Sequence, residues 1–335
     1  MRVGLALPHY DFSFPDGKPL SWDRLLEVAL RAESLGFDSV WISDHFCLEL
    51  GRYGGPDGVH ASIEPFTALA ALAAATERVR LGTLVACAPF RHVGILAKMA
   101  TTIDLASRGR FDLGLGAGWY EGEFEAFGYP FPSVGERFSQ LEEQVEALTG
   151  LFGEDPVDFD GSLVHLHGAF NRPRPAQAGG PPIWLGGKGG DRLLRLVARH
   201  GHGWNSVWRW TPEALGARAS RLRELCEEAE RDPSTVGLSV GLFSVLGEDA
   251  ADVAARWEAA QRWTPGGAMD GVSVQDFAGD TLTGTVESCV ERLSAFASHG
   301  VEEVILSFGP LPFALFDDEQ LELAGERLIP QAHAL

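Results

Sequence analysis

The chain has 335 residues, and its 47 Asp and Glu side chains outnumber 27 Lys and Arg, which gives a formal net charge of -20. Because so acidic a chain offers no basic surface to a polyanion, we expect neither a nucleic acid nor an anionic membrane as a partner. Hydrophobic residues make up 45% of the sequence, and its longest apolar run, 66–75, is too short to span a bilayer. We therefore expect a globular cytoplasmic protein that acts on small molecules.

The cysteines are too scattered to form a zinc knuckle or a disulfide framework. Cys47, Cys87, Cys226 and Cys289 contain no CxxC pair. This spacing favours a reducing compartment, in agreement with a cytoplasmic location.

Short apolar strands alternate with amphipathic helices along the chain. The first helix is predicted to have Ser21 as its N-cap and to end at Gly36, with apolar residues spaced by three and four between them. A run of eight such units predicts a closed (β/α)8 TIM barrel, built as a single domain over residues 1–335. The predicted strands are 3–7, 39–43, 79–85, 111–115, 183–185, 203–207, 237–245 and 303–308.

Three insertions interrupt this alternation. Residues 47–62 form a Gly-rich loop with aromatic residues after the second strand, and residues 156–182 predict a hairpin (157–160 and 163–166) with a proline-rich connector. Residues 247–283 predict an excursion of loop and helix after the seventh strand. Because loops at the C-terminal ends of barrel strands build the active site, the first and third insertions are candidate lids.

The second strand ends in an acid and an imidazole, Asp44 and His45. At the rim of a barrel, a histidine titrates near working pH and can polarise or deprotonate a substrate oxygen, while the carboxylate orients a neighbour. The structural alternative is that Asp44 caps a loop and that His45 is a packing residue.

Glycines follow two further strands. Gly114, Gly116 and Gly118 alternate before Trp119, and they suit either close approach to a flat ring or phosphate, or tight packing between strands. They are not a dinucleotide-binding fingerprint, because Trp119 stands where GxGxxG requires glycine. Gly186-Gly187-Lys188 precedes a helix, where free amide groups bind phosphate, but an ordinary tight turn has the same pattern.

Two other patterns suggest binding. Trp204, Trp208 and Trp210 cluster at one strand end and form either a pocket wall or part of the core. His165 and His167 lie on one side of a predicted surface hairpin without a third ligand, so we expect no metal centre there.

Taken together, the sequence resembles the luciferase-like monooxygenase superfamily, and within it the branch of oxidoreductases that use the deazaflavin coenzyme F420. The resemblance covers most of the chain. It is carried by the stretches TERVRLGTLVAC (76–87), LAKMATTIDLASRGR (96–110), GLGAGWY (114–120) with EFEAFGYP (123–130), and PPIWLGG (181–187) with GWN (203–205).

This resemblance implies a barrel with an excursion after the seventh strand and a cofactor ring in its mouth. It also implies a bulge with a non-prolyl cis peptide at Leu84 and Val85 behind the ring. His45 would handle a proton during hydride transfer and Asp44 would position the ring. The cofactor-binding residues implied are Asp44, Leu84, Val85, Cys87, Gly116, Gly118, Trp119, Gly186 and Gly187.

The expected substrate pocket differs from that of some relatives. Trp119 stands where some dehydrogenases of this type carry a glutamate, while the side chains of Glu121 and Glu123 need not face the site. A bulky residue there, together with few lysines, argues against a sugar phosphate and for a larger, partly aromatic or lipid-like substrate. The pocket residues expected are His9, Phe46, Trp208 and Trp210.

Other functions fit the same pattern. The nearest is an FMN-dependent monooxygenase that receives reduced flavin from a separate reductase and activates oxygen. A metal-dependent barrel isomerase or hydrolase would use His9, His45 and Asp44, and a flavin-binding scaffold without activity is the third alternative. The Ala-rich stretch 66–75 is a candidate contact face for a homodimer.

Overall fold

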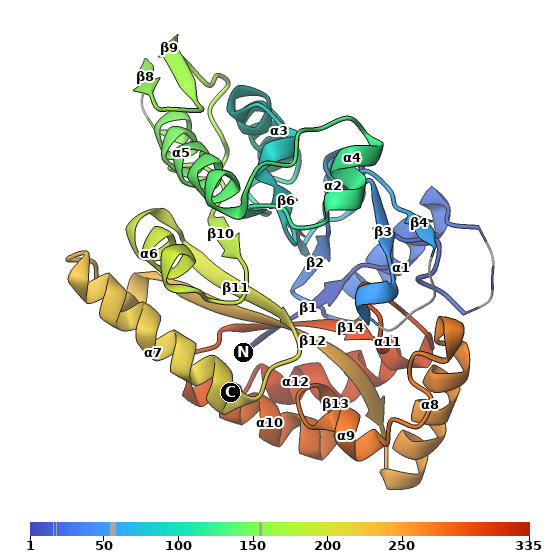
Figure 1. Ribbon diagram of the computed structural model, residues 1–335. Coiled ribbons are helices and arrows are strands. Elements are labelled where there is room, and N and C mark those ends of the chain that lie inside the picture. Colours follow the sequence, from blue (N-terminus) through green and yellow to red (C-terminus); the bar gives the residue numbers. More distant parts are fainter. Residues whose placement is uncertain (16, 18, 54–57, 154–155) are drawn as a thin grey trace.

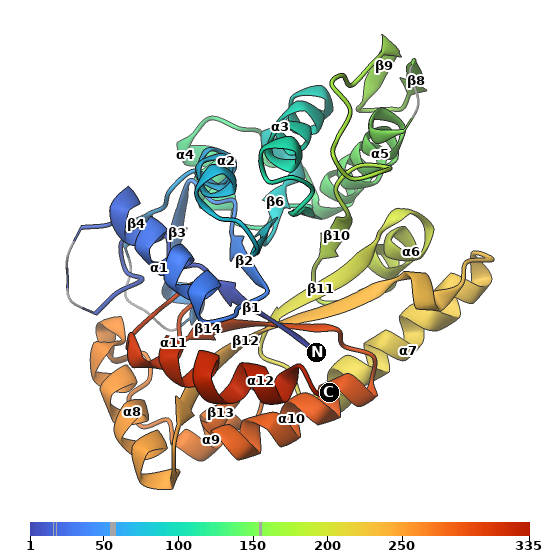
Figure 2. The same ribbon diagram turned by 180° about the vertical axis from the view of Figure 1, so that it is seen from behind.

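The computed structural model describes residues 1–15, 17, 19–53, 58–153 and 156–335. Within them, eight parallel strands close into a barrel with helices around it (Figures 1 and 2). The pairing of Ile183 with Leu113 and of Arg2 with Glu303 completes the ring. Around the barrel, the strands are β1 (Arg2–Ala6), β2 (Ser39–Ile42), β5 (Arg80–Thr83), β7 (Phe111–Gly116), β10 (Ile183–Gly186), β11 (Gly203–Trp208), β12 (Gly237–Gly247) and β14 (Glu303–Phe308). This confirms the predicted fold class.

The helices that cover the barrel follow the predicted alternation. The hydroxyl of Ser21 accepts a hydrogen bond from the Arg24 amide at 3.3 Å and caps the first of them, as its sequence indicates. The helices are α1 (Trp22–Ser34), α2 (Pro65–Ala75), α3 (Val93–Ala106), α4 (Glu121–Ala126), α5 (Val134–Phe152), α6 (Asp191–His200), α7 (Pro212–Glu228), α8 (Ala250–Trp263), α9 (Val274–Ala278), α10 (Val286–Ser298), α11 (Glu319–Leu323) and α12 (Ile329–Ala332).

The first two insertions each contain an antiparallel hairpin. In the first, β3 (Cys47–Glu49) pairs with β4 (Val59–Ala61), and a 3-10 turn (Gly51–Tyr53) follows β3. The part of this insertion at 54–57 lies outside the described residues. In the second, β8 (Val157–Asp160) pairs with β9 (His165–Ala169), which confirms the predicted hairpin, although its second strand begins two residues later than 163.

The third insertion contains α8, α9 and a short strand that the sequence pattern did not indicate. That strand, β13 (Leu282–Thr285), pairs with the end of β12, which runs to Gly247 instead of 245. The predicted excursion is therefore observed, but it also widens the sheet at this point.

The apolar side of α2 belongs to the core of the chain. Phe66, Leu69 and Leu72 are buried within the chain, and the exposed positions of α2 carry Thr67 and alanines. Among the described residues, no helix has both the length and the apolar character needed to cross a membrane.

Candidate active site

A cavity of about 560 Å³ opens at the C-terminal ends of the barrel strands. Its volume lies in the usual range for a pocket that holds a small organic ligand. Eleven of the expected catalytic, cofactor-binding and pocket residues line it: Asp44, His45, Leu84, Val85, Cys87, Gly116, Gly118, Trp119, Gly186, Gly187 and Trp208.

One wall of the cavity is a bulge between β5 and a short strand, β6 (Ala86–Cys87). The peptide bond between Leu84 and Val85 is cis, as the family resemblance implies, and both residues line the cavity. The predicted strand 79–85 is therefore interrupted at Leu84. A second non-prolyl cis bond, between Val207 and Trp208, also lies at the cavity wall.

The strand-end glycines make room for this bulge. A Cβ at Gly116 would lie 2.7 Å from Val85 Cγ2, and one at Gly186 would lie 2.7 Å from Val85 Cγ1. Of the two roles that the sequence left open for Gly116, tight packing between strands therefore accounts for this glycine, and Gly186 is packed against Val85 in the same way. Gly118 is required on two grounds, because its φ of +76° favours glycine and a Cβ there would lie 2.8 Å from Cys87 Sγ.

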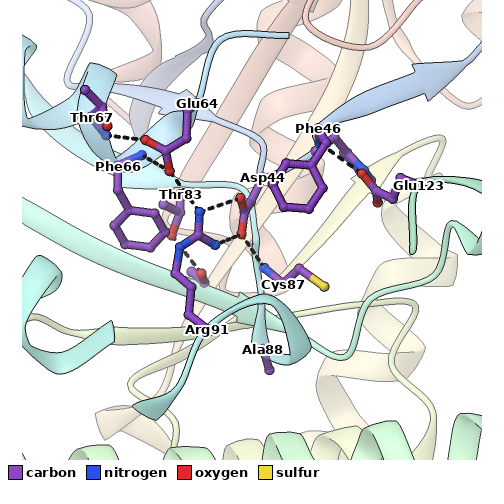
Figure 3. Close-up of polar contacts among 12 residues, drawn as sticks. Asp44, Phe46, Glu64, Phe66, Thr67, Thr83, Cys87, Ala88, Arg91 and Glu123 are labelled. Carbon is purple, nitrogen blue, oxygen red and sulfur yellow. Dashed lines mark hydrogen bonds and ion pairs between the residues drawn. The ribbon is translucent and has the colours of Figure 1, made fainter. Parts of the chain in front are cut away.

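The carboxylate of Asp44 is bound by the guanidinium of Arg91 (Figure 3). Its two carboxylate oxygens accept hydrogen bonds from Arg91 at 2.5 and 3.0 Å, and Oδ2 also accepts one from the Cys87 amide at 2.8 Å. Arg91 also contacts Glu64, which caps α2. Burial alone would lower the pKa of Arg91, but the neighbouring carboxylates raise it overall. Asp44 thus joins the end of β2 to the bulge.

His45 is oriented by a buried glutamate that sequence reasoning did not select. Glu123, in the first turn of α4, is 1% exposed, and its Oε1 lies 2.8 Å from His45 Nδ1. Its other oxygen accepts a hydrogen bond from the Phe46 amide at 3.0 Å (Figure 3). A carboxylate only accepts, so Nδ1 carries a proton, and in the neutral form of the ring the lone pair is on Nε2.

His9 lies behind the cavity wall instead of lining it, so its assignment to the substrate pocket is corrected. It is fully buried, and its Nδ1 lies 2.7 Å from the Leu7 carbonyl oxygen and its Nε2 2.9 Å from Ser43 Oγ. Burial lowers the pKa of His9 to about 3. The neutral ring donates to Leu7 and accepts from Ser43, which in turn accepts from Tyr10 at 2.6 Å. Ser43 and Tyr10 line the cavity.

Two other predicted pocket residues also point elsewhere. Phe46 packs against Phe90 and Phe127, with ring centroids 4.5 and 4.6 Å away, because Glu123 fixes its backbone and the ring joins this aromatic cluster. Trp210 packs against Trp204 at 6.3 Å and does not line the cavity. Both assignments are therefore corrected.

The rest of the pocket wall is aromatic. Trp208, at the end of β11, stacks on Phe243 with a centroid distance of 5.3 Å and an interplanar angle of 10°. Phe313 meets the Trp208 ring edge-on at 5.2 Å. These rings are buried against one another, so they present an apolar surface to a ligand.

No group of three or more His, Cys, Asp or Glu with metal-binding geometry occurs among the described residues. His165 lies on the exposed hairpin, where its Nδ1 is 2.9 Å from an Asp160 oxygen.

Comparison with known proteins supports the family that the sequence resembles. The family model of the luciferase-like monooxygenases matches residues 1–303. An F420-dependent glucose-6-phosphate dehydrogenase of Amycolatopsis mediterranei is 37% identical over 182 residues, 53% of this chain and 51% of that protein. The match therefore spans only about half of that relative's length.

Other relatives match over nearly the whole chain. An F420-dependent hydroxymycolic acid dehydrogenase of Mycobacterium tuberculosis is 28% identical over 95% of this chain and 83% of its own. An FMNH(2)-dependent dimethylsulfone monooxygenase of Pseudomonas putida is 26% identical over 94% and 90%. The structure of an F420-dependent secondary alcohol dehydrogenase with an F420-acetone adduct shares the fold, with a TM-score of 0.77, 21% identity and coverage of 99% and 98%.

The family match over residues 1–303, together with the closed barrel, shows that this chain belongs to the luciferase-like monooxygenase family.

Proposed function

We propose that the protein is an F420-dependent oxidoreductase that transfers a hydride between the deazaflavin and the hydroxyl- or carbonyl-bearing carbon of an organic substrate. The observation that carries this proposal is the Glu123–His45 pair, which places an imidazole with a free Nε2 in a cavity of ligand size. Relatives described as F420-dependent dehydrogenases support the choice of cofactor.

The cavity residues suit a flat heterocycle. The bulge at Leu84 and Val85 presents an apolar surface on which a ring can lie. Asp44 binds Arg91, so this carboxylate holds the bulge in place before any ligand is bound. Gly118 and Gly187 would let a ligand approach the backbone closely. When bound, F420 would supply the two-electron carrier that accepts or gives up a hydride.

His45 provides the proton transfer that must accompany the hydride. When an alcohol is oxidised, its carbon loses the hydride and its oxygen loses a proton, and a carbonyl group forms. The free Nε2 of His45 accepts that proton, while Glu123 stabilises the imidazolium through Nδ1. In the reverse direction His45 donates the proton to the carbonyl oxygen. The aromatic wall of Trp208, Phe243 and Phe313 favours a substrate with an apolar or aromatic body.

Anaerobic titration of the purified protein with F420 and with FMN tests the cofactor. We expect saturable binding of F420 that is at least about tenfold tighter than that of FMN, followed by F420 reduction when a panel of aromatic and aliphatic secondary alcohols is added. Tight FMN binding with no F420 binding would refute the proposal.

A second candidate is an FMN-dependent monooxygenase, favoured by the similarity to the dimethylsulfone monooxygenase over 94% of this chain. It would need reduced flavin from a separate reductase. Substrate-dependent oxygen consumption with reduced FMN, in the absence of F420, identifies this function.

We further propose that the protein acts as a homodimer in the cytoplasm and that, in the direction of carbonyl reduction, a separate reductase supplies the reduced cofactor. Its four cysteines are free and buried, which suits a reducing compartment. Light scattering of the purified protein should give a mass near twice the 36.2 kDa of one chain, and a mass of one chain would exclude the dimer.

A further inference from the structure

Two cations stand at the mouth of the cavity. Arg52, in the 3-10 turn of the first insertion, and Lys188, after β10, both line the cavity and are exposed. Among the described residues, neither forms an ion pair with a carboxylate. On a chain with a net charge of -20, this pair is a local positive region.

The acids that line the cavity, and the neighbouring Asp280, have hydrogen-bonded partners of their own among the described residues. Asp44 binds Arg91, and Glu123 binds His45 and the Phe46 amide. Asp280 pairs with Arg209 at 2.8 Å. Although Asp280 raises the pKa of Lys188 at a distance, no carboxylate of the described residues contacts Arg52 or Lys188, so both charges can bind a ligand.

Aromatic side chains hold the two cations in place. The guanidinium of Arg52 lies over the Trp119 ring, 4.4 Å from its centroid, and the Trp119 and His45 rings form a T-shaped pair with centroids 5.5 Å apart. The ammonium of Lys188 lies 5.1 Å from the Trp210 centroid and donates a hydrogen bond to the Val207 carbonyl oxygen. Burial, and then the charge of Arg52, lower the pKa of Lys188, which agrees with the two cations facing the same space.

We propose that Arg52 and Lys188 form an anion-binding site at the cavity mouth, which holds the carboxylate or phosphate of a molecule bound inside. The inference rests on the proposed function, because it takes the cavity as the place where cofactor and substrate bind. Because Trp208, Phe243 and Phe313 line the same cavity and His45 contacts Trp119, the apolar part of an acid bound at this site would extend toward His45. The site then favours an amphipathic acid as substrate. The phosphate of the cofactor has the same chemistry.

Calorimetric titration with 4-phenylbutyrate, and with its neutral amide as control, tests this site. We expect Arg52→Gln and Lys188→Met each to weaken binding of the acid about tenfold or more and binding of the amide less than about twofold. Arg195→Gln is the matched control, since it removes a charge from the exposed pair with Glu228 outside the cavity. It should leave the affinity for the acid unchanged.

The same variants are titrated with F420 and with the deazaflavin riboside that lacks its phosphate and tail. If the variants bind 4-phenylbutyrate more weakly but bind F420 as wild type does, the site belongs to the substrate. If the variants bind F420 more weakly but bind the riboside and the acid as wild type does, the site belongs to the cofactor, which also supports the proposed anion-binding site. If neither variant changes the affinity for any of these anions, the site does not exist. A wild-type protein that binds the acid but no deazaflavin would refute the proposed function alone.

Discussion

At the residue scale, the proposed chemistry depends on two side chains separated by 78 positions in the chain. Glu123 fixes the tautomer of His45 and is itself fixed by the Phe46 amide, which follows His45 directly. The carboxylate is buried, so water competes little for its hydrogen bonds. This arrangement orients the imidazole before any ligand binds.

Glu123→Gln should lower kcat/KM about 100-fold while the affinity for cofactor stays within about twofold. The amide oxygen would accept from Phe46, and its NH2 group would then face Nδ1 and favour the wrong tautomer of His45. Steady-state kinetics and a cofactor titration measure both effects. The control is Glu121→Gln, an exposed acid on the same helix that should behave like wild type. Equal activity of the two variants would exclude a positioning role for Glu123.

His45→Ala should lower kcat/KM about 10²- to 10⁴-fold, because the proton-accepting group is lost. The cofactor affinity of this variant should stay near that of wild type, since the support at Leu84 and Val85 is intact. Turnover at the wild-type rate would remove His45 from the mechanism.

His9 makes the stability of the protein depend on pH. Its pKa is about 3 in the folded protein, below the ordinary value of 6.5, so the folded state keeps the ring neutral. As the pH falls below 6.5 the unfolded chain takes up a proton that the folded chain does not, and stability falls by about 1.4 kcal/mol per pH unit. We therefore expect the free energy of unfolding, measured with urea, to fall between pH 7 and pH 5 by about 2 kcal/mol less in His9→Gln than in wild type. Equal losses would mean that His9 is protonated in the folded state.

At the element scale, the bulge at Leu84 and Val85 depends on the glycines of neighbouring strands. Gly116→Ala should lower the free energy of unfolding by about 1–3 kcal/mol, because the new Cβ would lie 2.7 Å from Val85 Cγ2. The double variant with Val85→Ala should recover most of that loss, since the same Cβ would lie 4.0 Å from Val85 Cβ. Urea unfolding of wild type, the two single variants and the double variant gives the coupling free energy between the two positions. If the two losses of stability simply add, the packing described here is wrong.

Arg91 links β2, α2 and the bulge. Arg91→Met should destabilise the protein by about 3–5 kcal/mol, because Asp44 would be left buried without its cation, and cofactor binding should be lost with it. The matched control is Arg80→Met, which breaks the pair with Asp112 at the opposite end of the barrel. It should destabilise the protein but leave cofactor affinity unchanged. Loss of affinity in both variants would show a general effect of stability.

The elements could be predicted because their signals are local. Alternating apolar runs and helix caps such as Ser21 depend on nearby residues, so the eight barrel strands appear where they were expected. The bulge was found only through the family resemblance, because the apolar run 79–85 reads as one strand. The short strand β13 was missed because its partner is the extended end of β12.

Among the site residues too, those with a local signal could be predicted, and those that depend on distant contacts could not. His45 and the glycines follow strands directly, so their place at the rim follows from the barrel. Glu123 and Arg91 act through contacts that only the folded chain brings together. His9 and Phe46 lie beside the expected positions, but buried hydrogen bonds and an aromatic cluster turn them away from the cavity.

At the scale of the whole molecule, the barrel gathers the ends of distant strands into one cavity. The bulge after β5, the histidine after β2 and the aromatic wall of β11 and β12 meet there. Leu48, Arg52 and Tyr53 of the first insertion line one side of the cavity.

A crystal structure of the protein soaked with oxidised F420 tests the central claim most directly. We expect the deazaflavin ring to lie on Leu84 and Val85, with the imidazole of His45 facing the side of the ring that receives the hydride and still bonded to Glu123. A ring bound elsewhere, or an imidazole turned away from it, would contradict the account.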